Sequence, residues 1–248
     1  MPLNKISTRA PKNFNKAKTK TRTAQLVGEI GELQKILYAQ SKHSLLVVLQ
    51  GLDASGKDGL VASVFKGVNP LGCSVKAFKV PSTEERAHDF LWRIHREAPE
   101  RGMIRIFNRS HYEDVLVPWV EGQIDEKTLK KRYGHINDFE YLLAENNTTI
   151  LKFYLHISPG EQHDRLVERK TNKLKFWKHN DGDWETAKKF DRYINAYENI
   201  FRNCNRPEWI VVPSDQNWYK EYLVAEKIVE ALRGMKLAYP SKINSGKG

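Results

Sequence analysis

The sequence predicts an α/β fold of three layers, in which a central parallel sheet of five strands lies between two layers of helices. Short apolar segments alternate along the chain with segments of helical periodicity, which is typical of a parallel sheet covered by helices on both faces. The chain of 248 residues is long enough for one such domain with its own core. A glycine-rich turn joins the first apolar segment directly to a helical segment, which places that turn at an edge of the sheet.

The predicted elements follow one another in a regular order. A first helix is expected in 23–41, because leucine and isoleucine recur there at helical spacing. The short apolar run Ser44–Gln50 predicts a buried parallel strand. The further predicted strands are Ser74–Val80, Met103–Phe107, Thr149–Ile157 and Trp209–Pro213. The further predicted helices are 57–68, Glu84–Arg96, Asp125–Glu145, Gly160–Lys170 and Tyr219–Arg233.

The charge balance favours a polyanionic partner. Lys and Arg total 41 against 30 Asp and Glu, which gives a net charge of +11 and a pI near 9.5. Such a surplus suits nucleic acid, anionic lipid or a phosphate-rich substrate, although many basic proteins bind none of these. Residues 1–22 hold seven Lys or Arg and no acid, and we expect a flexible basic arm there. The domain itself is expected over 23–240, with a loose tail in 241–248.

Other features narrow the class of protein. Cys73 and Cys204 are far apart and belong to no cluster of Cys and His, so a structural zinc site is not expected. The N-terminus lacks the apolar region of a secretory signal, and no run of 18 apolar residues exists. We therefore expect a cytoplasmic protein in a reducing compartment, without a membrane partner.

The sharpest motif is the glycine-rich turn, which matches the pattern GxxxxGK between a strand and a helix. Two glycines allow backbone conformations that are closed to other residues, so that backbone N–H groups point inward around a phosphate. The N-terminus of the following helix and a lysine add positive field and charge. The predicted phosphate-binding residues of this turn are Gly51, Ala54, Ser55, Gly56, Lys57 and Asp58.

The motif departs from the usual pattern of nucleoside triphosphatases at two positions. Asp58 stands where those proteins place Ser or Thr to hold Mg²⁺. Asp53 lies inside the turn, where a carboxylate would repel phosphate unless a cation lies between them. We therefore predict that Asp53 binds Mg²⁺ or orients an acceptor phosphate; the alternative is a residue that merely shapes the turn.

A second motif follows the third predicted strand. A P-loop kinase usually ends this strand with an acid that binds Mg²⁺, but here the position holds Asn108. Glu113 and Asp114 follow within one or two helical turns and are predicted to take over metal binding. A basic segment, Arg165–Arg192, then holds nine Lys or Arg between the fourth and fifth strands, and we predict a mobile helical lid there.

The motifs taken together resemble the polyphosphate kinase 2 family. The segments that carry the resemblance are Gly51–Gly59 (GLDASGKDG), His88–His95 (HDFLWRIH), Phe107–Val117 (FNRSHYEDVLV) and parts of Glu168–Lys178 (ERK and KFWK). The resemblance spans about residues 25–235 and is much more specific than the glycine-rich turn alone. The continuation EDV is most similar to the third class of that family, whose members phosphorylate both nucleoside monophosphates and diphosphates.

The resemblance implies a P-loop kinase fold similar to that of thymidylate kinase. It also implies a donor of inorganic polyphosphate, an acceptor nucleotide (AMP, ADP or both, with guanine nucleotides as an alternative) and Mg²⁺, which Mn²⁺ could replace. Reaction in reverse would consume ATP. The positions that match functional residues of the family are Asp53, Lys57, Asn108, Arg109, Glu113 and Asp114, together with Arg165 and Arg169 of the lid.

These residues suggest how the transfer would be assisted, since phosphoryl transfer asks a protein mainly for position and charge. Lys57 and the backbone amides of the turn would hold phosphate, while Asp53 and either Glu113 or Asp114 would hold the metal ion. Arginines form bidentate forks that suit phosphate, so Arg109 and Arg169 would stabilise the transferring group. Outside this centre, the polyphosphate chain would lie along the lid lysines Lys173, Lys175 and Lys178.

Two other functions stay open at this point. An ATP-dependent nucleotide or small-molecule kinase would share the fold, but its turn would normally carry Lys-Ser or Lys-Thr. A nucleic-acid-binding protein would explain the charge of +11, but the sequence contains no RNP motif, zinc finger or helix-turn-helix pattern, so no specific nucleic acid is expected. The preferred base, the direction of the reaction and the choice between a homodimer and a homotetramer are not determined by the sequence.

Overall fold

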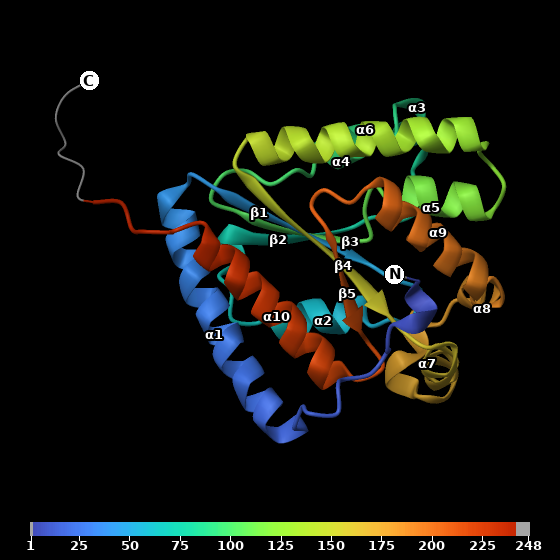
Figure 1. Ribbon diagram of the computed structural model, residues 1–248, viewed down its shortest axis with the longest axis horizontal. Coiled ribbons are helices and arrows are strands. Elements are labelled where there is room, and N and C mark those ends of the chain that lie inside the picture. The colour runs from blue at the N-terminus through green and yellow to red at the C-terminus, as the bar shows by residue number, and fades with distance from the viewer. Residues whose placement is uncertain (1, 242–248) are drawn as a thin grey trace.

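The central sheet has five parallel strands, as the sequence predicts. The computed structural model describes residues 2–241, and its strands lie in the order β2-β3-β1-β4-β5 (Figure 1). The strands are β1 (Ser44–Gln50), β2 (Cys73–Ala77), β3 (Ile104–Asn108), β4 (Thr148–His156) and β5 (Trp209–Pro213). Each neighbouring pair is parallel, so that the carboxyl ends of all five strands lie at one edge of the sheet.

Helices cover both faces of the sheet and complete three layers (Figure 1). One face carries α1 (Lys16–Gln40), α2 (Lys57–Val64) and α10 (Asn217–Gly234). The other face carries α5 (Glu113–Val120), α6 (Glu126–Glu145) and α9 (Phe190–Asn203). The segment predicted as a lid, 165–192, includes most of α7 (Pro159–Thr171), the 3₁₀ helix η3 (Lys173–Lys178), α8 (Asp181–Lys188) and the start of α9.

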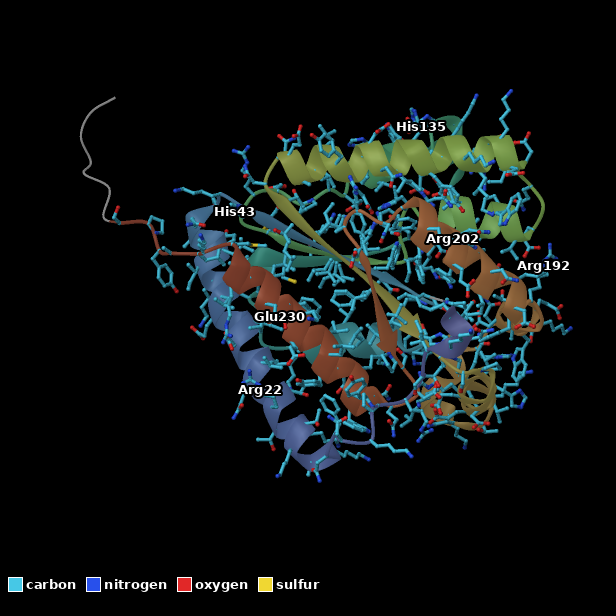
Figure 2. The ribbon with its side chains drawn as sticks, viewed as in Figure 1. Arg22, His43, His135, Arg192, Arg202 and Glu230 are labelled. Atoms are coloured by element: carbon cyan, nitrogen blue, oxygen red, sulfur yellow. The ribbon has the colours of Figure 1, made fainter. Side chains whose placement is uncertain are left out.

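The central strand β1 divides the core into two halves. Every residue of β1 is buried, which explains its uninterrupted apolar sequence. Leu46 and Val48 pack toward α5, α6 and α9, whereas Leu45 and Val47 pack toward α1, α2 and α10. Charged side chains instead lie over the outer surfaces of the helices, as Arg22 on α1 and Glu230 on α10 illustrate (Figure 2). Among the described residues, no helix combines the length and apolar character needed to cross a lipid bilayer.

The helix predicted over Glu84–Arg96 is wrong in its extent. The structure has two short helices there, α3 (Thr83–Ala87) and α4 (Trp92–His95). The chain is extended at His88, and the Asp89 carboxylate accepts a hydrogen bond from the Leu91 amide at 2.9 Å. Such a local bond competes with the helical hydrogen-bond pattern, which accounts for the interruption.

The N-terminal segment also differs from the predicted flexible arm. Residues 16–22 belong to α1, which begins after an Asn15 side chain that accepts a hydrogen bond from the Lys18 amide. Leu3 is fully buried, and its amide donates to the Glu198 carboxylate at 2.7 Å. Leu3 and hydrogen bonds such as that from the Thr8 hydroxyl to the Asp215 carboxylate at 2.7 Å therefore anchor a segment whose basic composition indicated disorder. The last residues of the predicted tail, 242–248, lie outside the described part of the chain.

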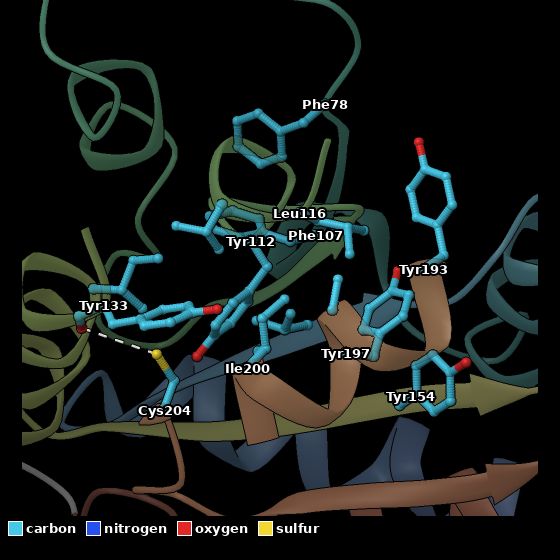
Figure 3. Packing of buried hydrophobic residues seen from close by; sticks show 14 of the residues in the cluster. Phe78, Phe107, Tyr112, Leu116, Tyr133, Tyr154, Tyr193, Tyr197, Ile200 and Cys204 are labelled. Atoms are coloured by element: carbon cyan, nitrogen blue, oxygen red, sulfur yellow. Dashed lines mark hydrogen bonds between the residues drawn. The ribbon is translucent and has the colours of Figure 1, made fainter. Parts of the chain in front are cut away.

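A fully buried ion pair joins β4 to α6, next to the segment that follows β3. Lys152 of β4 donates hydrogen bonds to Glu140 of α6 at 2.7 Å and to the Tyr112 hydroxyl at 3.0 Å. Burial alone would raise the pKa of Glu140, but the hydrogen bond from His111 and the charge of Lys152 lower it below its ordinary value. Tyr112 and Cys204 lie in the surrounding apolar cluster (Figure 3). This network joins the sheet and α6 to the segment that follows Asn108.

We predict that Lys152→Met destabilises the fold, because it leaves the Glu140 carboxylate buried without its cation. The free energy of unfolding, measured by urea denaturation, should fall by about 3–5 kcal/mol. The control is Lys227→Met, which removes a lysine whose partner Glu230 lies at the surface, 2.6 Å away. That change should cost less than about 1 kcal/mol. Equal losses in both variants would contradict the role assigned to the buried pair.

Candidate active site

The glycine-rich turn forms a loop at the carboxyl end of β1. Gly56 has φ +92°, and Gly51 has φ +151°, where a Cβ atom would lie 2.9 Å from the Leu155 carbonyl oxygen. Ala54 also adopts a left-handed conformation, with φ 62°. These values confirm that the loop needs glycine at both ends of the motif.

The loop leaves several backbone amides free for an anion. Within residues 2–241, the amides of Asp53, Ala54 and Gly56 donate to no backbone or side-chain acceptor. The amides of Lys57 and Asp58 follow at the first positions of α2, where no intrahelical partner exists. Free amides beside the positive end of a helix dipole are suited to binding an anion, which is the role that the motif predicts.

Two carbonyl groups of the same loop accept hydrogen bonds from side chains of α7. Gln162 of α7 donates to the Asp53 carbonyl at 3.1 Å, and Arg165 of α7 donates to the Ala54 carbonyl at 3.0 Å. Arg165 also donates to the Ser214 carbonyl at 2.7 Å. The predicted role of Arg165 in reaching the phosphates is therefore not what the geometry shows, because its guanidinium supports the loop from behind.

Lys57 is buried and lies folded against the start of its own loop. Its ammonium group donates to the carbonyls of Gly51 at 2.7 Å and Leu52 at 3.2 Å. Burial, followed by the charge of Arg109, lowers the pKa of Lys57 to about 8. An anion bound by the loop would pair with the Lys57 ammonium and favour its charged form.

Arg109 connects the loop with the second motif. Its guanidinium is hydrogen-bonded to Asp53 and lies 3.7 Å from the Glu113 carboxylate. Its backbone has φ 62°, and its amide donates to the Leu49 carbonyl at 3.0 Å. Burial lowers the pKa of Arg109, but the carboxylates of Glu113 and Asp53 outweigh this effect and raise it. Burial also raises the pKa of Glu113, against the opposing charge of Arg109. The cation and both acids therefore form one coupled cluster.

Asp58 joins the loop to the lid. Its carboxylate accepts from the Asn108 side chain at 2.8 Å and from the Lys178 ammonium at 3.1 Å. Burial would raise the pKa of Asp58, but these two hydrogen bonds lower it overall. Asp58, which replaces the usual Ser or Thr, therefore binds the side chain of Lys178 in this structure.

A cavity of about 570 Å³ opens above the loop and brings most of the predicted site together. The predicted residues that line it are Asp53, Ala54, Gly56, Lys57, Asp58, Asn108, Arg109, Arg169 and Lys178. Gly51 and Ser55 belong to the loop but do not line the cavity. Glu113 contacts the cavity residue Arg109. Lys173 and Lys175 lie on η3, away from the cavity.

The cavity also includes residues that sequence reasoning missed. Asp183 lies at its edge, where its carboxylate pairs with Arg169. Burial, followed by the charge of Asp53, raises the pKa of Asp183. Lys79 and Asn180 line the cavity as well. None of the three belongs to a recognisable motif, so only the fold of the lid over the sheet edge reveals them.

Asp114 is placed differently from the prediction. It pairs with Arg93 at 2.9 Å and lines a second cavity of about 630 Å³, bounded by α3, α4 and α6. His135 of α6 lies at this second cavity and marks its side of the molecule in Figure 2. Because Arg93 also donates to the carbonyl of Lys79, which lines the first cavity, the two cavities are neighbours.

The residues near Arg109 fit a magnesium ion, although residues 2–241 contain no group of three or more His, Cys, Asp or Glu arranged to hold a metal. Asp53 and Glu113 supply carboxylates, and the side-chain amide oxygen of Gln50, whose nitrogen donates to Glu113, is buried without a partner among the described residues. Mg²⁺ is commonly bound by one or two carboxylates together with substrate phosphates and water. Asp53 and Glu113 are therefore suitable ligands if Arg109 releases Asp53, whereas Asp114 lies at the second cavity and pairs with Arg93.

Comparisons with known proteins show the family of the chain. A family model described as Polyphosphate kinase 2 matches residues 13–240. An AMP/ADP-polyphosphate phosphotransferase of Meiothermus ruber is 48% identical over 219 residues, covering 88% of this chain and 82% of that protein. An ADP-polyphosphate phosphotransferase of Rhodopseudomonas palustris is 38% identical over 228 residues, covering 86% of this chain and 79% of that protein.

A solved structure shows the same architecture. The crystal structure of polyphosphate kinase 2 from Arthrobacter aurescens matches with a TM-score of 0.95 and 37% sequence identity. The match covers 99% of this chain and 90% of that chain. The P-loop kinase fold inferred from the sequence is thereby confirmed.

The pKa of Lys57 predicts a pH dependence of anion binding. With a pKa of about 8, the side chain is charged below that pH and neutral above it. The affinity for inorganic tripolyphosphate, measured by calorimetry without nucleotide, should therefore fall by about tenfold between pH 7.5 and 9. In Lys57→Met, binding should be weaker, and this fall should be absent. An identical fall in the variant would show that another group titrates.

Proposed function

Since the chain belongs to the polyphosphate kinase 2 family, we propose that it transfers phosphoryl groups from inorganic polyphosphate to AMP or ADP, reversibly and with Mg²⁺. The observation that supports this most directly is the loop with free amides, which faces a cavity containing Lys57 and Arg109. The printed activities of the two relatives name polyphosphate together with AMP/ADP or with ADP. Assembly as a homodimer or homotetramer and a cytoplasmic location stay predictions.

The two neighbouring cavities suggest separate places for donor and acceptor. The first contains the loop amides and would hold the end of the polyphosphate chain. The second contains Arg86, Arg93 and Arg132, together with the apolar side chains of Phe90 and Leu91, and would hold the nucleotide. Arg93 lies at the boundary, where it would face the acceptor phosphate. A mixed lining of cations and apolar groups suits a nucleotide, which has both a charged and an aromatic end.

The transfer itself needs little covalent chemistry from the protein. An ionised oxygen of the acceptor phosphate attacks the terminal phosphorus of polyphosphate, and the bond to the next phosphate breaks, so that the leaving group is a chain shorter by one unit. The attacking oxygen carries no proton that a base must remove. Lys57 and the loop amides would hold the donor, while Arg109 would stabilise the charge on the transferring group.

Two further groups complete the proposed centre. Asp53 and Glu113 would hold Mg²⁺, which would neutralise phosphate charge between donor and acceptor. Arg169 pairs with Asp183 in this structure, so it would have to exchange that carboxylate for phosphate when substrate binds. Asp183 would thus hold the Arg169 guanidinium at the cavity until substrate binds.

The reaction can be tested directly by chromatography of nucleotide products. We expect ADP and ATP to form from AMP with polyphosphate and Mg²⁺, and ATP to form from ADP. Lys57→Ala should lower the rate by at least about 100-fold while the unfolding midpoint stays close to that of the wild type. A variant with near-normal activity would refute the loop assignment. Preference for ATP over polyphosphate as donor to AMP would favour the alternative kinase.

The lid lysines give a second prediction. Lys178 lines the cavity, whereas Lys175 pairs with Glu168 at 2.6 Å near the outer surface. Replacement of Lys173, Lys175 and Lys178 by Gln should raise the KM for long-chain polyphosphate more than the KM for nucleotide, because a long polyanion meets more of these charges.

The control changes the same net charge at a distance from the lid. Lys42, Lys66 and Lys236 are exposed in turns outside the predicted lid, and their replacement by Gln should leave both KM values nearly unchanged. Equal losses for polyphosphate and nucleotide in the lid variant would argue against a polyphosphate path along the lid.

A further inference from the structure

We propose that Lys220 of α10 is a positioning residue that holds the phosphate-binding loop in the shape needed for the donor. This inference rests on the proposed function, because the loop matters only if it binds polyphosphate. Lys220 lies outside all motifs of the sequence, in a helix to which the resemblance assigned no function. It is also one of the few lysines that the fold buries completely.

Lys220 touches the loop from the side opposite the cavity. Its side chain is 1% exposed, and its ammonium nitrogen lies 3.3 Å from the Ser55 carbonyl oxygen and 3.4 Å from that of Gly56. The Asn217 side chain, one helical turn earlier, accepts from the same nitrogen at 2.9 Å. A Cβ atom at Gly56 would lie only 2.3 Å from this nitrogen. Gly56 is therefore needed both for its backbone angle and for the approach of Lys220.

The position of Lys220 completes a pattern along the loop. Consecutive carbonyls from Gly51 to Gly56 each accept a hydrogen bond from a buried or half-buried side chain. The donors are Lys57 for the first two carbonyls, Gln162 for the third, Arg165 for the fourth and Lys220 for the last two. A carbonyl that is held on one side of the backbone turns the amide of the same peptide bond to the other side. Lys220 thus orients the amides of Gly56 and Lys57, which lead into α2.

Burial of an ammonium group costs desolvation free energy, and most residues on the same face of α10 are apolar. Burial, followed by the nearby charge of Arg165, lowers the pKa of Lys220 to about 7. The charged groups that face it are Arg165 and Glu161 of α7, Glu221 of α10, and Lys57 at the start of α2. An apolar side chain would avoid this cost, so the lysine indicates a functional demand at this place. The nearby cations Arg165 and Lys57 make that place favourable for a polyanion on the other side of the loop.

The test compares Lys220→Met with Lys227→Met, which removes an exposed lysine from the same helix. For Lys220→Met we expect the KM for polyphosphate to rise by about tenfold, while the KM for AMP changes less than twofold. Lys227→Met should alter neither constant. Folding of each variant is checked by circular dichroism and thermal unfolding.

A comparison of KM with kcat distinguishes a positioning role of Lys220 from a role in stability alone. A variant that is only less stable would lose active enzyme, which lowers kcat and leaves both KM values in place. That result, or an unchanged polyphosphate KM in a folded variant, would overturn the proposal. A parallel titration with inorganic tripolyphosphate alone keeps the inference separate from the proposed function. If the wild type binds tripolyphosphate but transfers nothing, the proposed reaction fails; if Lys220→Met binds it as tightly as the wild type, the role of Lys220 fails.

Discussion

The direction of six consecutive carbonyl groups, from Gly51 to Gly56, determines how this molecule can meet phosphate. Side chains from α2, α7 and α10 hold these oxygens, and the amides of Asp53, Ala54 and Gly56 remain available to an anion. The glycines permit this shape, but they do not enforce it. A flexible glycine-rich loop would lose entropy on binding an anion, so the surrounding donors serve by ordering the loop in advance.

The same principle extends to the second motif. Arg109 is held in a left-handed backbone conformation, between the carboxylates of Asp53 and Glu113. The residues that follow it, His111 and Tyr112, are buried against the Glu140–Lys152 pair rather than directed at the cavity. The motif thus combines one residue that lines the cavity with others that fix its position. Membership in the polyphosphate kinase 2 family fits this arrangement, because transfer between phosphoanhydrides depends on charges at fixed positions.

Much of the fold and part of the site follow from local sequence. The strands and most of the long helices were predictable because apolar periodicity reflects burial directly, but α5 and α9 were not predicted. The glycine motif identified the loop, and Lys57, Asp58, Asn108 and Arg109 do meet at one cavity. The interruption between α3 and α4 was not predictable from periodicity. It depends on one hydrogen bond, from the Leu91 amide to the Asp89 carboxylate, which outweighs the helical tendency of the segment. The burial of Leu3 likewise depends on a surface formed by distant residues such as Glu198.

The sequence by itself determined which chemistry this protein can support, since a glycine-bent loop with a lysine is a local pattern that has few other uses. It also determined the family, through several motifs in a set order. Only the tertiary structure decided which charged residues face the cavity: Asp183 enters it, Asp114 turns to Arg93, and Arg165 and Lys220 support the loop from behind. The physical reason is that a charge acts on whatever lies within a few ångströms of it, and such neighbours come from segments far apart in the chain.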